Sequence, residues 1–363
     1  ISVGVWNNHN SAMSIIKNMN DAHGVKTFAV GFAVSSSYKR YYEDVADNGG
    51  TNDALFADDQ STLITTLTDA IKQAIAGTYT FTTPAVMSEK QKGNFIYQAT
   101  FKYSRNKQWE GYLKKHTIVN GKIGSVVWDA ADRLNKKSAS SRKLWTIGLS
   151  SKNINNFTTS YRGDLKNKLF PNSSPTDAET DELINFIRGV DTYDEDGDGN
   201  KTEERHKLAD IYHSDLAVVG KPEATFQNDG SSNFEKKDAY YRSQNNYSNF
   251  INGNSCGTSC QSRKEVVYAA SNSGILHAFD TSNGEELWGY IPPNIIGKLS
   301  TMISSKANTT NAIYGIDGSP VVKDIYYGGS WKTILLAGLG AGGHGYFALD
   351  VTDINNPKHL FAI

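Results

Sequence analysis

The hydrophobic and polar positions of the first part of the chain alternate between helical and strand patterns. Residues 25–33 are a short, mostly apolar and β-prone run, which is typical of a buried strand in a parallel sheet. Apolar residues at helical spacing precede this run between 11 and 19, and a second helical stripe extends from Ser61 to Gly77. The pattern predicts a layered α/β domain over residues 1–78.

From residue 79 onward the pattern changes to short strands and turns, and parts of it repeat. A strand-and-turn segment at 274–280 has a related copy at 345–350, and the segment 214–220 is echoed by 318–324. Repeated strand and turn signals with Gly and aromatic residues are typical of β-propeller blades. We therefore predict a mainly β chain with a β-propeller, and a meandering β-sandwich is the alternative.

The repeat spacing predicts long insertions between the strands. Equivalent positions, Asp280 and Asp350, lie 70 residues apart, whereas an ordinary blade takes about 40–50 residues. Residues 131–180 and 222–262 are rich in Asn, Ser, Lys and Asp, so we expect surface excursions there rather than core. The propeller domain is predicted over 79–363, incomplete at its C-terminal end because the last residues resemble the middle of a strand.

Composition argues against nucleic-acid binding, binding to anionic membranes and a membrane-spanning helix. The chain has 37 basic and 38 acidic residues and a net charge of −1, which argues against a broad basic face for nucleic acid or anionic membrane. No run approaches the roughly 20 apolar residues of a membrane-spanning helix. Abundant Gly, Tyr, Phe, Asn and Ser suit many short strands joined by tight turns, as in exported bacterial surface proteins.

The two cysteines, Cys256 and Cys260, are separated by three residues. In an oxidising compartment we expect them to form a disulfide, whose very small loop adds little global stability. Two free thiols are the alternative. Zinc is not expected, because no second ligand pair lies nearby in the sequence.

The strongest candidate site is an acidic run between residues 191 and 204. From Asp194 it has the pattern D-x-D-x-D-G-N, in which alternate carboxylates converge on one point and a glycine permits a sharp bend, as in a calcium loop. Hard oxygen ligands favour Ca²⁺ over transition metals. The predicted ligands are Asp194, Asp196, Asp198, Asn200, Glu203 and Glu204.

This loop departs from a complete EF-hand. Arg205 occupies position 12, where a bidentate Glu belongs, so the closing acid must be Glu203, Glu204 or a residue elsewhere. A second frame begins at Asp196 and uses the carbonyl of Thr202; its side-chain ligands are Asp196, Asp198, Asn200 and Glu204. A solvated acidic loop without a metal is the alternative. We expect a structural or switching role and no catalytic residue.

Two other motifs are weaker. Arg162-Gly163-Asp164 is a tripeptide that integrins recognise when it lies on an exposed loop, and such triplets also occur by chance. The glycine-rich segment 338–345 runs into another strand pattern and not into a helix, so it predicts a turn between strands and no nucleotide site. The sequence contains no nucleophile elbow and no H-E-x-x-H motif.

The element order of residues 1–78 resembles the last half of a von Willebrand factor A domain. The likeness lies in residues 27–32, 46–50 and 56–59. In that family a D-x-S-x-S motif near the start of the domain holds a metal ion. No such motif is present in this sequence, so no metal ligand is assigned to this domain.

The propeller region resembles the PilC/PilY1 family of type IV pilus adhesins. The likeness lies in 188–191, 207–214, 267–280, 317–322 and 338–345. It implies a quinoprotein-like propeller in a surface protein of the pilus tip or outer membrane, exported through the periplasm, that acts in pilus biogenesis, adhesion and twitching motility.

The same resemblance implies a bound Ca²⁺ that influences pilus extension and retraction. It implies pilins or minor pilins as partners, a host-cell receptor as a further candidate partner, and no nucleic acid. The calcium-binding role of the family is assigned in this sequence only to the acidic run. The residues are Asp194, Asp196, Asp198, Asn200 and the nearby Glu203 and Glu204.

Two alternatives remain at this point. The repeat G-x-L-x-A-F-D followed by N-G-E-E-x-W also resembles quinoprotein dehydrogenases, propellers that bind pyrroloquinoline quinone and calcium. Those enzymes place adjacent cysteines beside the quinone, whereas Cys256 and Cys260 are not adjacent, and a shared fold does not confer the activity. We therefore expect a protein that is not an enzyme. The other alternative is a non-adhesive propeller scaffold.

Overall fold

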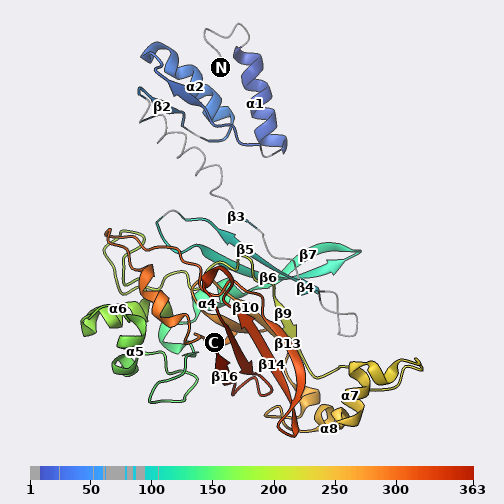
Figure 1. The fold of residues 1–363 in the computed structure, drawn as a ribbon. Coiled ribbons are helices and arrows are strands. Elements are labelled where there is room, and N and C mark those ends of the chain that lie inside the picture. The colour runs from blue at the N-terminus through green and yellow to red at the C-terminus, as the bar shows by residue number, and fades with distance from the viewer. Residues whose placement is uncertain are drawn as a thin grey trace. The chain divides into compact units, whose positions relative to one another are not determined.

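The computed structural model describes residues 9–23, 25–51, 53–59, 62, 78–79, 85–86, 95–104 and 106–363 (Figure 1). The chain divides into two compact units, Ile1–Gly77 and Thr78–Ile363. The predicted helix from Ser61 to Gly77 lies outside the described residues, apart from Thr62.

The first unit alternates helices and strands as its pattern predicts. Its elements are α1 (His9–His23), β1 (Val30–Phe32), α2 (Ser36–Asn48) and β2 (Leu55–Ala57). Strands β1 and β2 pair in parallel, with Val30 opposite Leu55, and a small buried cluster including Met13, Val45 and Ala46 joins the helices to the strands. The likeness of this unit to a von Willebrand factor A domain stays a prediction.

The second unit begins with an antiparallel sheet of two very short and three long strands. It contains β3 (Thr78–Tyr79), β4 (Ala85–Val86), β5 (Phe95–Lys102), β6 (Glu110–Val119) and β7 (Lys122–Asp129). The order is β3-β5-β6-β7, with β4 also pairing with β5. Asn120 and Gly121 join β6 to β7 with φ values of 50° and 73°, the left-handed conformations that a tight hairpin requires.

Two further sheets have the form of propeller blades. One contains β9 (Ala217–Val219), β10 (Val266–Ala270), β11 (Leu276–Asp280) and β12 (Glu286–Tyr290), paired in chain order, with β8 (Leu144–Trp145) added in parallel to β12. The other contains β13 (Val321–Tyr327), β14 (Ser330–Gly338), β15 (Tyr346–Asp350) and β16 (Lys358–Ala362). The two echoes in the sequence fall on their first strands, β9 and β13, and on their third strands, β11 and β15, so the predicted repeat is a repeat of blades.

A single buried apolar cluster spans these two blades. It contains Trp288 and Tyr290 from one blade and Leu335 and Phe347 from the other. The rings of Tyr290 and Phe347 lie 5.6 Å apart, and the Trp288 Nε1 donates a hydrogen bond of 2.8 Å to the carbonyl of Ile354 beyond β15. Each blade therefore buries a face against the other, as stacked repeats must.

The expectation that residues 131–180 are only a surface excursion is wrong. Trp145, Phe157, Leu165 and Leu169 are buried in the cluster that spans the blades. The segment contains most of helix α4 (Ala130–Lys136), helix α5 (Arg162–Leu169) and the start of helix α6 (Asp177–Arg188). Its 3-10 turns are η1 (Ala139–Ser141) and η2 (Thr159–Tyr161). Leu165 and Leu169 lie on helix α5, Trp145 lies in strand β8 and Phe157 lies in a connection, so the buried apolar residues are widely spaced among polar ones.

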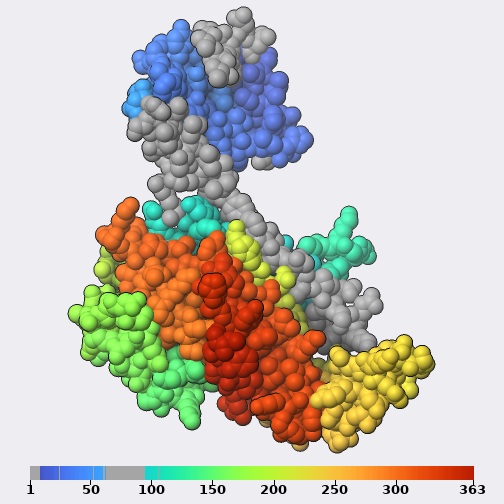
Figure 2. Space-filling model, viewed as in Figure 1, coloured from blue at the N-terminus to red at the C-terminus, as the bar shows by residue number. Residues whose placement is uncertain are grey.

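The second excursion, 222–262, forms a small lobe that packs on the β13–β14 hairpin (Figure 2). Tyr247, Phe250 and Trp331 form its buried cluster together with Cys256 and Cys260, which are joined as a disulfide. Its elements are η3 (Phe234–Lys236), α7 (Asp238–Gln244), α8 (Tyr247–Asn252) and η4 (Cys260–Ser262); η5 (Ile296–Met302) and η6 (Gly340–Gly342) lie in later connections. Among the described residues, no helix is long and apolar enough to cross a membrane.

Candidate metal centre in the acidic loop

The acidic loop begins directly after helix α6, whose two ends are well defined. Thr176 and Glu179 form a reciprocal capping box at the start of the helix. At the other end Gly189 has a φ of 119° and donates its N–H to the carbonyls of Asn185 and Phe186. The guanidinium of Arg188 also donates to the carbonyl of Phe157 at 2.8 Å, so the point from which the loop departs is fixed.

Backbone bonds close the loop at its base. Val190 and Glu204 form an antiparallel bridge, the N–H of Asp191 donates to the Glu203 carbonyl at 2.8 Å, and that of Arg205 donates to the Gly189 carbonyl at 2.9 Å. The run 191–204 is therefore a closed loop whose two ends lie side by side.

Inside the loop the chain makes a series of tight turns. Asp194, Gly197 and Gly199 have φ values of 54°, 77° and 87°. The Asp194 carboxylate accepts the N–H of Gly199 at 3.0 Å, and Asp198 accepts the N–H of Asn200 at 2.7 Å. These bonds to backbone N–H groups fix the Asp194 and Asp198 carboxylates against the turns of the loop.

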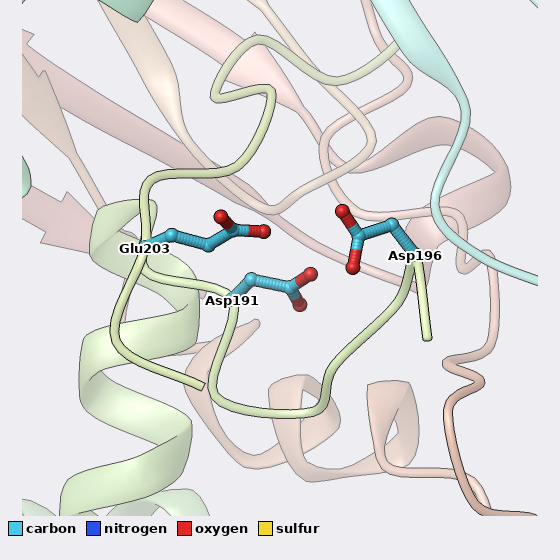
Figure 3. Close-up of side chains that lie close together, drawn as sticks. All are labelled: Asp191, Asp196 and Glu203. Carbon is cyan, nitrogen blue, oxygen red and sulfur yellow. The ribbon is translucent and has the colours of Figure 1, made fainter. Parts of the chain in front are cut away.

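Two groups of three carboxylates result, and Asp196 belongs to both. One contains Asp194, Asp196 and Asp198, and the other contains Asp191, Asp196 and Glu203; within each group one oxygen per residue lies within 4.8 Å of the others. Figure 3 shows the side chains of Asp191, Asp196 and Glu203 converging on a common space. The structure thus brings together four of the predicted ligands and adds Asp191.

Burial and mutual repulsion act on this second group. The Asp191 side chain is buried, and its burial, helped by the charges of Glu195 and Asp196, raises the pKa of its carboxyl. Desolvation followed by the charges of Asp198 and Asp196 raises the pKa of Glu203 in the same way. A cation between these oxygens would remove the repulsion, and carboxylate oxygens are the donors that Ca²⁺ prefers, so the residues present fit the ion.

Glu204 and Asn200 are placed differently from the other predicted ligands. The Glu204 carboxylate accepts the N–H of Ala139 at 2.9 Å and pairs with the buried Nζ of Lys207 at 2.7 Å, so it ties the loop to the excursion. The side-chain oxygen of Asn200 accepts from the hydroxyl and the N–H of Thr202 at 2.8 and 3.1 Å.

Arg205, which occupies the position of the closing EF-hand acid, also anchors the loop. Its Nε donates to Glu195 at 2.9 Å, and its guanidinium lies 4.1 Å from the centre of the Phe186 ring. The hydroxyl of Thr310 donates to the other oxygen of Glu195. Arg205 and Glu195 thus join the loop to Phe186 of helix α6 and to Thr310. Because Arg205 pairs with an acid of the loop, the described residues of this loop do not have the geometry of a complete EF-hand.

A hollow of about 190 Å³ lies beside the second carboxylate group and is lined in part by Asp191, Asp196 and Glu203. The nearby histidines have other partners. His206 Nε2 lies 2.8 Å from the Gly111 carbonyl, and His213 Nδ1 lies 2.6 Å from Asp317. These contacts give both rings structural roles.

The structure places the integrin-type tripeptide in the first turn of helix α5. Arg162 pairs with Asp181 and Asp177 of helix α6, and Asp164 accepts the N–H and the hydroxyl of Ser150 at 2.8 and 2.6 Å. The condition for integrin recognition, an exposed loop, is not met.

The paired blades with their shared core define the second unit as part of a β-propeller, with an acidic loop inserted before its first blade strand. Residues 208–362 match the family model described as the PilY1 beta-propeller domain. Through this domain the chain belongs to the PilY1 family.

Two similar proteins carry this relationship further along the chain. The Type IV pilus biogenesis factor PilY1 of Pseudomonas aeruginosa strain PAO1 is 30% identical over 325 residues, which cover 85% of this chain and 26% of that protein. A Type IV pilus biogenesis factor PilY1 homolog of Xylella fastidiosa is 28% identical and covers 68% of this chain and 18% of that protein. The chain spans about a quarter of the length of its Pseudomonas relative.

A solved structure, the Pseudomonas aeruginosa PilY1 C-terminal domain, aligns with 34% identity and a TM-score of 0.28, covering 40% of this chain and 25% of that one. The acidic loop lies just before the residues matched by the family model.

Proposed function

We propose that this chain belongs to a surface-exposed type IV pilus biogenesis factor that acts in pilus assembly, adhesion and twitching motility. Its support is the PilY1 propeller domain and the similarity to relatives named as type IV pilus biogenesis factors. The proposed location is the pilus tip or the outer membrane, reached through the periplasm. Pilins or minor pilins are the proposed partners, with a host-cell receptor as the target of adhesion.

We further propose that the acidic loop binds one Ca²⁺. The observation that carries this proposal is the pair of carboxylate groups that share Asp196 inside a loop closed at its base. Asp191, Asp194, Asp196, Asp198 and Glu203 would supply the oxygen ligands. Bound calcium would offset the repulsion among these acids and hold the loop in a single conformation, which is how a metal could influence the pilus.

The direct test is calorimetric titration of Ca²⁺ into protein stripped with a chelator. We expect saturation near one equivalent and loss of the binding heat in Asp196→Ala, since Asp196 belongs to both groups. Glu235→Ala is the matched control, because this exposed residue of η3 lies outside the acidic loop. Absence of binding heat in the wild type, with an unchanged melting temperature, would reduce the loop to a solvated acidic turn.

The cellular role is tested by expressing the full-length protein with Asp196→Ala or Glu235→Ala in a strain that lacks its own copy. We expect fewer surface pili or reduced twitching for Asp196→Ala alone. Normal pili and motility in a variant proven to bind no calcium would separate calcium from pilus function. Normal pili in the strain without any copy would contradict the biogenesis role itself.

A further inference from the structure

A cleft of about 570 Å³ lies between the first strands of the two blades, and none of its lining residues belongs to the acidic loop. Its walls include Val218 to Gly220 at the end of β9 and Val322 to Asp324 in β13. Both strands are at the edges of their sheets, and they approach each other where the N–H of Asp215 donates to the Ser319 hydroxyl at 2.9 Å. Its volume is within the roughly 300–1,000 Å³ of ligand sites.

The cleft contains a buried guanidinium with unused donors. Arg263 is 7% exposed, and it donates to the carbonyl of Gly220 through Nε and Nη2 and to the hydroxyl of Thr333 through Nη1 at 2.6 Å. These bonds use three of the five N–H groups of a guanidinium. Among the described residues, no carboxylate oxygen lies within the 4.0 Å of an ion pair with Arg263.

The nearest negative charge is already engaged. The Thr333 hydroxyl, which accepts a hydrogen bond from Arg263, donates to Asp324 Oδ1 at 2.6 Å. The Tyr247 hydroxyl donates to Oδ2 of the same carboxylate. Asp324 therefore stabilises the charge of Arg263 through the intervening hydroxyl of Thr333 and makes no direct ion pair with it. Because a buried charge is costly unless it is paired, Arg263 is suited to receive an anion from the cleft.

The remaining charges of the cleft favour a single carboxylate over a dianion. Lys221 pairs with Glu223 at 3.1 Å, and Arg242 lies 3.8 Å from Asp238. Glu265 and Asp324 also line the cleft, so the lining holds four basic and four acidic residues: Lys221, Arg242, Arg263 and Lys323 against Glu223, Asp238, Glu265 and Asp324. The lining carries no excess of positive charge that would hold a dianion, whereas one carboxylate matches the single guanidinium, which binds it through two parallel N–H groups.

We propose that this cleft binds the free carboxyl terminus of an extended polypeptide from a partner protein. The carboxylate would pair with Arg263, with the exposed Lys323 at the rim assisting, and the peptide would lie along the strand edges of β9 and β13, whose backbone groups can pair with an added strand. The mixed charges around the cleft would then select side chains near the chain end.

The probe is N-acetyl-triglycine, and its C-terminal amide is the comparison. Binding of each peptide to the whole chain is measured by the broadening of its acetyl signal in ligand-observed nuclear magnetic resonance. We expect the acetyl signal of the acid to broaden at least threefold more than that of the amide. Lys323→Glu should reduce the effect at least threefold without touching the core, and Lys122→Glu, a control at the exposed β6–β7 turn, should leave it unchanged. Arg263→Gln should abolish it if the variant folds.

Two outcomes would overturn the proposal. The first is equal broadening of acid and amide, or an effect that persists in Lys323→Glu. The second is displacement of the acid by inorganic phosphate at a lower concentration than by acetate, which would make the cleft a site for a dianion.

Discussion

Arg142 and Glu286 form a two-bond ion pair in the interior of the propeller unit. The Nε–Oε2 distance is 2.9 Å, the Nη2–Oε1 distance is 2.8 Å, and both side chains are fully buried. The Nη1 of Arg142 also donates to the carbonyl of Arg188 at 2.8 Å, where the acidic loop begins, and His277 Nδ1 lies 2.8 Å from Glu286. This ion pair thus connects strand β12, the segment 131–180 and the end of helix α6, from which the acidic loop departs.

Glu286→Gln should strongly destabilise the propeller unit. It leaves the buried guanidinium of Arg142 without its counter-charge, and loss of one partner of a buried pair costs about 3–5 kcal/mol. Urea unfolding measures the change in the free energy of unfolding. Asp177→Asn is the control, because its pair with Lys166 is at the surface and is worth less than about 1 kcal/mol. Similar losses for the two variants would contradict this prediction.

Asp210 should make the stability depend on pH. Burial, with the charge of Asp317 adding to it, raises the pKa of this carboxyl to about 6 from an ordinary 3.8, although Asn272 and Gln108 donate to it. The folded state therefore retains the proton longer than the unfolded state. The stabilisation from the protonated form is complete below pH 3.8 and is lost as the pH rises through about 6.

The check is the pH profile of unfolding for the wild type and for Asp210→Asn. The difference between the two profiles should change between about pH 4 and 6 and be flat above pH 7. The Asn amide would also face the donor of Gln108 or Asn272, so Asp210→Asn should cost about 1–3 kcal/mol. A constant difference across the whole range would show that Asp210 titrates normally.

The integrin-type tripeptide should not mediate adhesion by the folded protein. Arg162 is held by Asp181, and Asp164 by Ser150, within a helical turn. We expect the folded chain to bind immobilised integrin no better than Asp164→Glu, and a linear peptide of residues 159–167 to bind better than either. Specific binding by the folded wild type that Asp164→Glu abolishes would restore the integrin hypothesis.

The blades were predictable from the sequence because their information is local. Alternating strand patterns involve neighbouring residues, and the echo of 214–220 by 318–324 is a repeat of such a local pattern. The contribution of 131–180 to the core was not predictable in this way. Phe157, Leu165 and Leu169 are single apolar residues in polar surroundings, and only their packing against the blades shows them to be core.

Some residues of the candidate metal centre were also predictable from local spacing, and others were not. Asp194, Asp196 and Asp198 follow from spacing alone, because a tight turn brings alternate side chains together. Asp191 joins Asp196 and Glu203 only through the pairing of Val190 with Glu204, a contact between the two ends of the loop. Spacing likewise gave no means to separate the adjacent Glu203 and Glu204, and only their different partners in the structure distinguish them.

Glu203→Gln and Glu204→Gln should therefore have opposite effects on calcium and stability. Glu203 converges with Asp191 and Asp196, so its neutral variant should bind Ca²⁺ at least tenfold more weakly with little change in stability of the metal-free protein. Glu204 instead pairs with Lys207 and Ala139, so Glu204→Gln should keep the calcium affinity and cost about 1–3 kcal/mol of stability. Calorimetry and urea unfolding on the same two proteins separate these effects. A large loss of calcium affinity in Glu204→Gln alone would instead support the EF-hand frame that begins at Asp196.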